Sequence, residues 1–283
     1  MKISVIITAY NVEPYIATAI DSCLTQTHKD VEIIVVEDCS TDKTKDVIGN
    51  YAKNKRVKII YNEVNVGAGK ARRIGSEAAT GMYLLFLDGD DWLSSEYIKE
   101  LHDAAVATKA DIVSGGITEH HINGITKITK YADCELTGTD KLLRYWGGNT
   151  FFMCTKIVNR RLFDLVPYCE RRYIEDTPTI IPQTYYANKV VYVSNDGYHY
   201  RMRSDSLTHD TTPAKNALYT ALTGLELSDF FKERNPKIAE MVTYSTNLEL
   251  KKLKQAGVTK EMIEPFKEDF VNLGIKLLNV LNL

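Results

Sequence analysis

The first 92 residues alternate between short apolar runs and longer segments in which apolar residues recur with helical spacing. The apolar runs are rich in Ile and Val, as buried strands are, and they predict strands at residues 3–8, 31–36, 57–61 and 83–87. Between the first two runs, Ile16, Ile20 and Cys23 fall on one face of a helix. Strands that alternate with helices in this way predict a parallel sheet with helices on both faces.

Polar residues predict where these helices begin and end. Asn11 is a candidate cap for the first helix, with Pro14 in its first turn. A second helix is expected to begin at the Ser-Thr-Asp run of residues 40–42 and to continue to about residue 53. A third is expected at residues 68–80, with Gly81 as its end.

Four polar residues stand just past the ends of four predicted strands: Asn11, Asp38, Asn65 and Asp88. The carboxyl ends of parallel strands meet at one edge of a sheet, and ligands of such sheets bind there. We therefore expect these side chains to gather around one ligand site.

The pattern changes after Trp92. A helical segment at 96–108 precedes two strand-like runs at 111–118 and 125–131, which Asn123-Gly124 joins as a hairpin. Further strands are expected at 151–159 and 190–193. Beyond Pro213 strand signals cease, and helical stretches follow at 214–233, 236–256 and 260–281. We expect a first domain over residues 1–212 and a helical extension at 213–283.

Composition narrows the class of protein. With 35 basic and 37 acidic residues the formal net charge is −2, which argues against nucleic-acid binding through overall positive charge. No apolar run approaches the roughly 18 residues of a membrane span, and the apolar start is too short for a signal peptide. The five cysteines include no CxxC pair, which favours a reducing cytoplasm over a disulfide framework.

The stretch LLFLDGDDWL, residues 84–93, ends an apolar strand on three aspartates, Asp88, Asp90 and Asp91. On an extended strand end, Asp88 and Asp90 project to the same side. Carboxylates this close repel one another, and a divalent cation among them removes the repulsion. Mg²⁺ and Mn²⁺ take one or two carboxylates together with substrate phosphates, so the residues favour a metal–phosphate site. The alternative is a solvated acidic turn in which Asp91 caps a helix.

Two earlier segments carry further candidate chemistry. The run VVEDCSTDKT at 35–44 ends a strand in Glu37-Asp38, and Asp38 can accept hydrogen bonds from a base or a sugar. The run NVGAGKARRIG at 65–75 is not a P-loop, because Val64 and Ala71 stand where that motif needs Gly and Ser or Thr. We expect it to begin a helix whose amides, with one of its two adjacent arginines, face an anion.

Two later segments add a base and a lid. In YIEDTP at 173–178, a carboxylate opposite a metal–phosphate site suits the base that a hydroxyl nucleophile needs, and the alternative is an ordinary helix start. The run GYHYRMRSDSLT at 197–208 carries the basic and hydroxyl groups of a phosphate lid, and the alternative is a polar edge strand. We expect His120 and His121, in the hairpin, to be solvated.

Seven motifs of this chain resemble those of the family 2 glycosyltransferases, in the same order: TAYN at 8–11, EDCSTD at 37–42, NVGAGKARRIG at 65–75, ATGMYLLFLDGDD at 79–91, TKIVNRRLF at 155–163, IED at 174–176 and YHYRMRSDSLT at 198–208. That family consists of inverting enzymes of the GT-A fold that use nucleotide-diphosphate sugars. The resemblance covers residues 1–208 and implies an α/β fold in which helices flank a Rossmann-like mixed sheet. The helical C-terminal extension at 213–283 lies outside the resemblance and is expected from the sequence pattern alone. Residues 1–92 would bind the nucleotide sugar, and residues 93–212 would face the acceptor.

The resemblance also implies roles for individual residues. Thr8, Ala9 and Tyr10 would lie beside the base of the nucleotide, and Asp38 would hydrogen-bond the uracil. Arg72 would also approach the nucleotide, and Asp88 and Asp90 would engage the ribose and the metal. Arg201, Arg203 and Ser206 would form a lid over the diphosphate. Asp90 and Asp91 would hold the divalent cation, Mn²⁺ or Mg²⁺, and Asp176 would be the catalytic base. Glu37, Cys39 and Arg73 depart from the family's usual Asp, Gly and Asn.

The implied reaction moves a sugar from a nucleotide-diphosphate donor, most simply a UDP-sugar, to the hydroxyl of a saccharide or lipid-linked saccharide acceptor. Such an enzyme would serve polysaccharide or glycoconjugate synthesis in the cytoplasm or at the inner face of the membrane. Residues 213–283 would pack a homodimer or touch the membrane surface. The alternatives are a sugar-nucleotide-binding relative without catalysis, a nucleotidyltransferase, and a template-dependent polymerase that uses Gly89-Asp90-Asp91.

Overall fold

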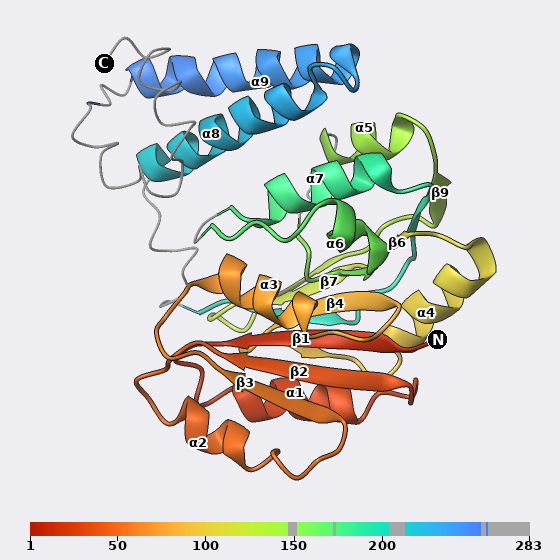
Figure 1. Cartoon of the computed structure of the whole chain (residues 1–283), viewed down its shortest axis with the longest axis vertical. Helices are drawn as coiled ribbons and strands as arrows, with labels where there is room; N and C mark the ends of the chain where they lie inside the picture. Colours follow the sequence, from red (N-terminus) through yellow and green to blue (C-terminus); the bar gives the residue numbers. More distant parts are fainter. Residues whose placement is uncertain (147–151, 172–173, 204–212, 256–258, 260–283) are drawn as a thin grey trace. The chain divides into compact units, whose positions relative to one another are not determined.

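The computed structural model describes residues 1–146, 152–171, 174–203, 213–255 and 259. The chain divides into two compact units, the first made of Met1–Glu170 and Thr179–Arg203, the second of Arg171–Pro178 and Ser204–Leu283. The first unit carries both β-sheets, and the second carries the two long C-terminal helices (Figure 1). The domain boundary predicted at residue 212 stays a prediction.

Within the described residues, the large sheet has eight strands in the order β3-β2-β1-β4-β10-β6-β11-β9. Their bounds are β1 Ile3–Ala9, β2 Val31–Glu37, β3 Val57–Tyr61, β4 Tyr83–Asp88, β6 Ile112–Ser114, β9 Cys134–Leu136, β10 Lys156–Asn159 and β11 Val190–Tyr192. The first four strands lie parallel, as the sequence predicts. Strand β10 is antiparallel to both of its neighbours, which makes the sheet mixed.

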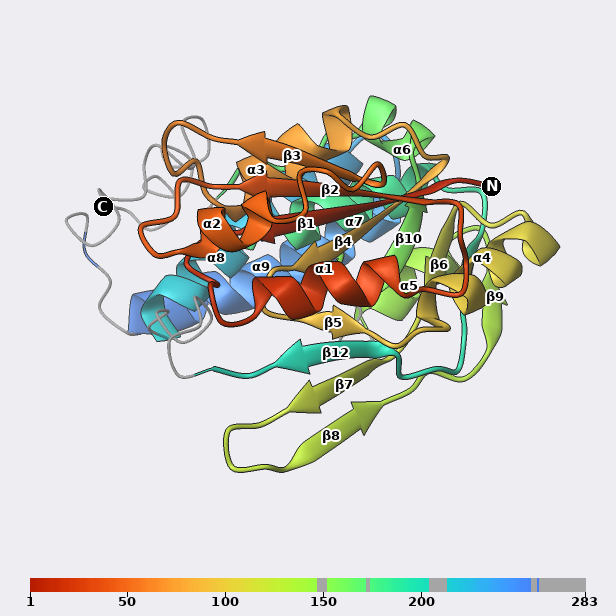
Figure 2. The same cartoon turned by 90° about the horizontal axis from the view of Figure 1, so that it is seen from below.

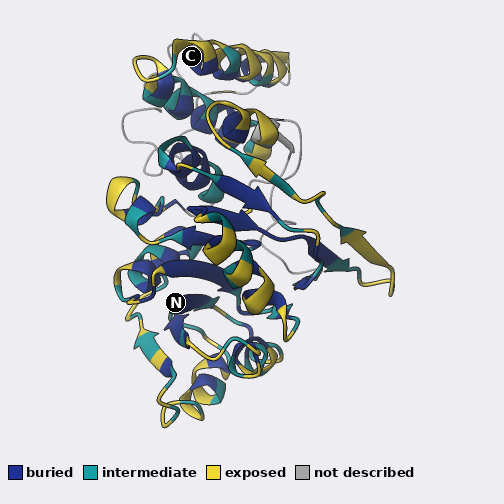
Figure 3. Cartoon of the chain, turned by 90° about the vertical axis from the view of Figure 1, so that its right-hand side faces the viewer, coloured by how far each residue is buried: buried dark blue, intermediate teal, exposed yellow. Residues whose placement is uncertain are grey.

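Helices cover both faces of the parallel strands: α1 Ile16–Leu24, α2 Thr44–Gly49, α3 Ala68–Glu77 and α4 Tyr97–Thr108. On one face, Val5 and Ile7 of β1 belong to the core that buries α1 and α4. On the other, α3 approaches so closely that a Cβ on Gly75 would lie 2.3 Å from Cγ2 of Ile6. The strands are the buried centre of this unit (Figure 3), and each fully buried Ile or Val stabilises the fold by about 1.5–3 kcal/mol.

The second sheet has its four strands in the order β5-β12-β7-β8, namely β5 Trp92–Leu93, β12 Tyr198–Arg201, β7 Ile117–His120 and β8 Thr126–Thr129 (Figure 2). The predicted hairpin is confirmed, since β7 and β8 pair antiparallel around a turn in which Gly124 has φ 80°. The prediction of one strand at 111–118 is wrong. The chain divides at Gly115-Gly116 into β6 and β7, and Gly116 N donates to Asn195 Oδ1 instead of to a strand. Both positions need glycine, because a Cβ on either would lie within 2.5 Å of an Asn195 oxygen.

Several predicted helix ends are wrong. Helix α1 begins after Tyr15, so neither Asn11 nor Pro14 belongs to it. Helix α2 ends at Gly49 rather than near residue 53, and α3 ends at Glu77. Gly81 is not a helix cap: a Cβ there would lie 2.7 Å from the Ser4 amide nitrogen, so Gly81 is required by close backbone packing.

The second half of the first unit contains elements that the apolar pattern did not predict. These are β5, β9, α5 Asp140–Trp146 and α6 Arg161–Leu165. The strand expected at 151–159 begins only at Lys156, and residue 151 lies outside the described residues. Short elements such as these have too few residues for periodicity to identify them.

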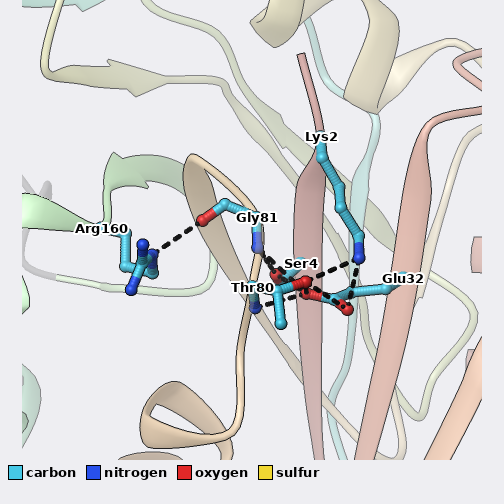
Figure 4. Close-up of polar contacts among 6 residues, drawn as sticks. All are labelled: Lys2, Ser4, Glu32, Thr80, Gly81 and Arg160. Carbon is cyan, nitrogen blue, oxygen red and sulfur yellow. Dashed lines mark hydrogen bonds and ion pairs between the residues drawn. The ribbon is translucent and has the colours of Figure 1, made fainter.

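At the amino ends of β1 and β2, Glu32 ties three segments together (Figure 4). Its carboxylate accepts hydrogen bonds from four residues: Lys2 Nζ at 2.7 Å, Thr80 N at 2.7 Å, Gly81 N at 3.0 Å and the Ser4 hydroxyl. Burial alone would raise the pKa of Glu32, but these hydrogen bonds lower it to about 2. The ionised carboxylate therefore links β1, β2 and the start of β4 at the end of the sheet opposite the predicted ligand edge.

In the second unit, helix α8 Pro213–Phe231 packs on α9 Pro236–Gln255. The helices meet closely at Gly224, where a Cβ would lie 2.1 Å from Oγ1 of Thr246. Leu250 and Leu253 are buried in this contact. The helix expected at 260–281 lies outside the described residues, and none of the helices that are described is long and apolar enough to cross a membrane.

Candidate functional site

The loops after β1 and β2 are joined by a series of hydrogen bonds. The Asn11 amide nitrogen donates to Ser40 Oγ at 3.1 Å, and Asn11 Oδ1 accepts from the Thr41 amide at 2.8 Å. Val12 N donates to Thr44 Oγ1 at 2.9 Å, Glu13 N donates to Asp42 Oδ2 at 3.1 Å, and Lys43 N donates to Glu13 Oε2 at 3.2 Å. Asn11 adopts φ 52°, which aims both its backbone and its side chain at the neighbouring loop. Hydrogen bonds therefore hold the two loops together at the carboxyl edge of the sheet.

Asp38 organises the loop that leads into α3. One of its oxygens accepts from Asn62 Nδ2 at 2.8 Å and from Val66 N at 2.9 Å, and the other accepts from Gly67 N at 2.9 Å. The residue is only 3% exposed. We expected the amides of this segment to face a ligand anion, but the anion that these two amides face is the Asp38 carboxylate itself. Its predicted contact with a uracil base stays a prediction.

Residues 88–91, which carry Asp88, Asp90 and Asp91, form the aspartate turn at the end of β4. This turn lies beside Thr8, which pairs with Asp88 in the register of β1 and β4. Gly89 N donates to the Thr8 carbonyl at 3.0 Å, and a Cβ on Gly89 would lie 2.8 Å from that oxygen. A glycine is therefore required between Asp88 and Asp90. The strand ends at Asp88 and a turn follows, so the prediction that Asp88 and Asp90 share one side of an extended strand is wrong.

Three guanidinium groups balance the charge of the aspartate turn. Arg72 Nη2 donates to Asp88 Oδ1 at 2.7 Å, and Arg203 Nε donates to Asp90 Oδ2 at 2.8 Å. Arg201 Nε donates to the Asp90 carbonyl at 3.0 Å. Arg73 instead contacts Glu77 and Glu170, so one arginine of the adjacent pair reaches the aspartates.

Asp91 differs from the other two aspartates in its surroundings. It is 1% exposed, its Oδ2 accepts from the Tyr198 hydroxyl at 2.6 Å, and its Oδ1 accepts from the Arg201 amide at 2.8 Å. Burial, followed by the Asp90 and Asp88 charges, raises the pKa of Asp91 well above the ordinary range. Burial and Asp88 also raise the pKa of Asp90, against the lowering effect of Arg203.

An aromatic cluster of Tyr15, Trp92, His120 and His199 supports Arg201 and Arg203, and sequence reasoning missed it. The Arg201 guanidinium lies 4.6 Å from the Trp92 ring centroid and 4.8 Å from that of Tyr15, and Arg203 lies 5.2 Å from Tyr15. His199 stacks on Trp92, and its Nδ1 shares a 3.0 Å hydrogen bond with His120 Nε2. The prediction that His120 is solvated is wrong. The adjacency of Trp92 to the aspartates was the available signal.

The remaining predicted residues are spread between the two units. Ala9 is buried, while Tyr10 exposes 42% of its surface. Asp176 is the first residue of helix α7 Asp176–Tyr186 and belongs to the second unit. Ser206 lies outside the described residues.

The carboxylates of Asp88 and Asp90 are candidate ligands for a divalent cation. Side chains of Asp88 and Asp90 are 32% and 14% exposed, and their carboxylates are the oxygen ligands that Mg²⁺ and Mn²⁺ prefer. In the described part of the chain no three His, Cys, Asp or Glu side chains are placed to hold a metal by themselves. The two carboxylates of Asp88 and Asp90 suit a cation that also takes phosphate oxygens, because Mg²⁺ usually combines one or two carboxylates with substrate phosphates. Asp91 has both oxygens engaged, and its predicted share in the metal stays a prediction.

Comparison with known proteins gives consistent matches. Residues 4–165 match the model of the family described as "Glycosyl transferase family 2". "Glycosyltransferase GlyA" of Streptococcus pneumoniae is 30% identical over 221 residues, which cover 73% of this chain and 31% of that protein. "Uncharacterized glycosyltransferase EpsJ" of Bacillus subtilis is 31% identical over 216 residues, which cover 73% of this chain and 62% of that protein. The chain thus spans less than two thirds of the length of either relative.

A solved structure of Staphylococcus aureus TarS, residues 1–349 in complex with UDP, superposes with a TM-score of 0.65 at 25% identity and covers 80% of this chain and 65% of that one. Its architecture agrees with the mixed sheet flanked by helices described above, so the predicted GT-A fold class is confirmed. The family model covers more than half of the chain. The protein is therefore a member of glycosyl transferase family 2.

Proposed function

We propose that this chain transfers a sugar from a nucleotide-diphosphate donor, with UDP-sugars as the first candidates, to an acceptor hydroxyl with inversion at the anomeric carbon. The observation that carries the proposal is the pairing of Asp88 and Asp90 with Arg72 and Arg203 at the carboxyl edge of β1 and β4. This arrangement offers carboxylates to a ribose or cation, and guanidinium groups to a diphosphate. The family membership and the complex of TarS with UDP support the same donor class.

In the proposed reaction, the acceptor oxygen forms a bond to the anomeric carbon on the face opposite the diphosphate. The bond from that carbon to the diphosphate oxygen breaks, and its electron pair leaves with the diphosphate. Asp176 takes the proton of the acceptor hydroxyl, the role that the family resemblance gives it. Arg201 and Arg203, which contact Asp90, would present positive charge to the leaving group.

A divalent cation, Mn²⁺ or Mg²⁺, is part of the proposal. Asp90, with Asp88 beside it, would hold the cation together with the diphosphate oxygens. When bound there, it would supply Lewis-acid stabilisation of negative charge on the leaving group. Arg203, which contacts Asp90 at 2.8 Å, would then be able to turn to the diphosphate.

The acceptor is proposed more broadly, as a saccharide or a lipid-linked saccharide. Residues 213–283 are proposed to form a homodimer contact or to dock on a membrane surface, where a lipid-linked acceptor would lie. The exposed side chains of Tyr244 and Leu248, one turn apart on α9, are the described apolar groups that support such a contact.

The donor is tested by a thermal-shift panel of UDP, dTDP, GDP, CDP and ATP, each with Mn²⁺, Mg²⁺ or EDTA. A ligand at about 100 times its Kd stabilises a protein by about 2.7 kcal/mol, which gives a clear shift of Tm. We expect a shift for UDP that requires the metal. A shift for another diphosphate would change the donor within the same enzyme class. No shift for any nucleotide would favour a relative that has lost the reaction.

A further inference from the structure

Strand β12, which ends at Arg201 two residues before Arg203, is paired over its whole length with β7 but only at its start with β5. Its antiparallel partner β5 is two residues long, and the ladder stops at the pair His199 and Trp92. On the other side, Met202 N donates to the His120 carbonyl at 3.0 Å. The amide of Arg201 is the next donor on the β5 side, where no strand continues.

The side chain of Asp91 occupies that position. Its Oδ1 accepts the Arg201 amide at 2.8 Å, and its Oδ2 accepts the hydroxyl of Tyr198, three residues earlier on the same strand, at 2.6 Å. Tyr198 is fully buried and Asp91 is 1% exposed, so these bonds are shielded from water. A hydrogen bond that is shielded from water in this way is stronger than an exposed one. The Asp91 carboxylate thus accepts the backbone hydrogen bond that a longer β5 would accept from Arg201.

The consequence appears at Asp90, one residue before Asp91 in the aspartate turn. With β12 held at Tyr198 and Arg201, the Arg201 guanidinium reaches the Asp90 carbonyl at 3.0 Å and lies on the Trp92 ring. Arg203 reaches the Asp90 carboxylate at 2.8 Å. Both guanidinium groups are therefore placed by contacts with the protein itself.

We propose that Asp91 is a positioning residue that anchors β12 through Tyr198 and the Arg201 amide, so that Arg201 and Arg203 face the diphosphate, and that Asp91 does not ligate the metal. This inference rests on the proposed function. It assigns the three aspartates different tasks: Asp88 and Asp90 act toward the ligand, and Asp91 acts toward the protein.

Three variants and one control separate the two roles of Asp91. Asp91→Asn keeps the shape, accepts the Arg201 amide through its carbonyl oxygen and donates its NH₂ to the Tyr198 oxygen, but it is a poor metal ligand. Asp91→Ala removes the anchor, and Tyr198→Phe removes one of its two bonds. Tyr83→Phe is the matched control, because its buried hydroxyl donates to the Ala110 carbonyl from the opposite end of β4.

The first measurement needs no ligand. Limited trypsin digestion followed by mass spectrometry gives the rate of cleavage after Arg201 and Arg203. Loss of a buried hydrogen bond that leaves its partner unpaired corresponds to about tenfold in local opening. We expect cleavage about tenfold faster in Asp91→Ala, faster also in Tyr198→Phe, and unchanged in Asp91→Asn and Tyr83→Phe. Wild-type rates in both Asp91→Ala and Tyr198→Phe would overturn the anchor.

The second measurement is UDP affinity by calorimetry, with Mn²⁺ and with EDTA. We expect Asp91→Asn to keep the wild-type ratio of the two Kd values, and Asp91→Ala and Tyr198→Phe to weaken UDP by a similar factor in both conditions. If Asp91→Asn abolishes the effect of Mn²⁺ while Tyr198→Phe keeps it, Asp91 is a metal ligand and the inference is wrong. A wild-type protein that binds no nucleotide would refute the proposed function, and the digestion would still decide the anchor.

Discussion

At the scale of single residues, Cys39 adopts a backbone conformation that costs stability and that the sequence does not reveal. It stands where the family usually has Gly, and it adopts φ 60°, a left-handed conformation that costs a residue with a Cβ free energy. The sequence identified the departure, but it could not show that the position needs a positive φ. Its thiol makes only a 3.4 Å contact with the Glu63 carbonyl in return.

We therefore expect Cys39→Gly to raise the free energy of unfolding by about 0.5–1 kcal/mol. Urea denaturation of the purified variant measures this change. Cys39→Ser is the control, because it keeps a Cβ at the same φ and should bring no gain. Equal stability of all three proteins would mean that the local backbone relaxes without cost.

The candidate site was predictable as a set of residues and not as a set of contacts. Asp38, Asp88 and Asp90 lie at the carboxyl edge of the sheet, as strand ends in the sequence indicated. The partners of Asp38 and Asp91 were not predictable. They come from segments 24 to 110 residues away, and hydrophobic periodicity carries no information on such pairings.

At the scale of elements, the parallel strands were predictable because each is a continuous apolar run. The small sheet was not, because β5 has two residues and the break at Gly115-Gly116 depends on Asn195, far along the chain. Helix ends failed for a similar reason. Asn11 looks like a helix cap in sequence, but Ser40 and Thr41 of the neighbouring loop bind it instead.

The Glu32 cluster gives a prediction about pH at this scale. Because the pKa of Glu32 is lowered to about 2, its carboxylate contributes stability above its ordinary pKa of 4.5, and that contribution is lost as the pH falls toward 2. We expect Glu32→Gln to lower the free energy of unfolding by about 1–3 kcal/mol at pH 7. Urea denaturation at pH 7, 5, 4 and 3 should show the difference from wild type shrinking below pH 4.5.

The control for this experiment is Glu77→Gln, which removes an exposed i, i+4 pair with Arg73. We expect it to change stability by less than about 0.5 kcal/mol at any pH. A difference between Glu32→Gln and wild type that stays constant down to pH 3 would contradict the role given to the ionised carboxylate.

At the scale of the whole molecule, the proposed tasks are divided between the two units. The aspartate turn and the arginines that contact it belong to the first unit, whereas Asp176 belongs to the second. We therefore expect mutations to separate donor-nucleotide binding from the proposed removal of the acceptor proton.

We expect Asp176→Asn to lower kcat for transfer by about 10²–10⁴-fold, because the amide cannot take the acceptor proton, and to leave the metal-dependent Tm shift with UDP unchanged. Release of UDP from a UDP-sugar with a saccharide acceptor measures transfer. Asp164→Asn, in the first turn of α6, is the matched control and should be fully active. Transfer at the wild-type rate by Asp176→Asn would show that another group is the base.

The hydrogen bonds between the loops after β1 and β2 have a consequence for protein engineering. Asn11, Val12 and Glu13 on one loop and Ser40 to Thr44 on the other satisfy each other's polar groups. A chimera that takes only one of these loops from a relative would leave backbone amides of the other without partners. In a chimera with a relative, residues 10–13 and 39–44 should therefore be transplanted together as a single cassette.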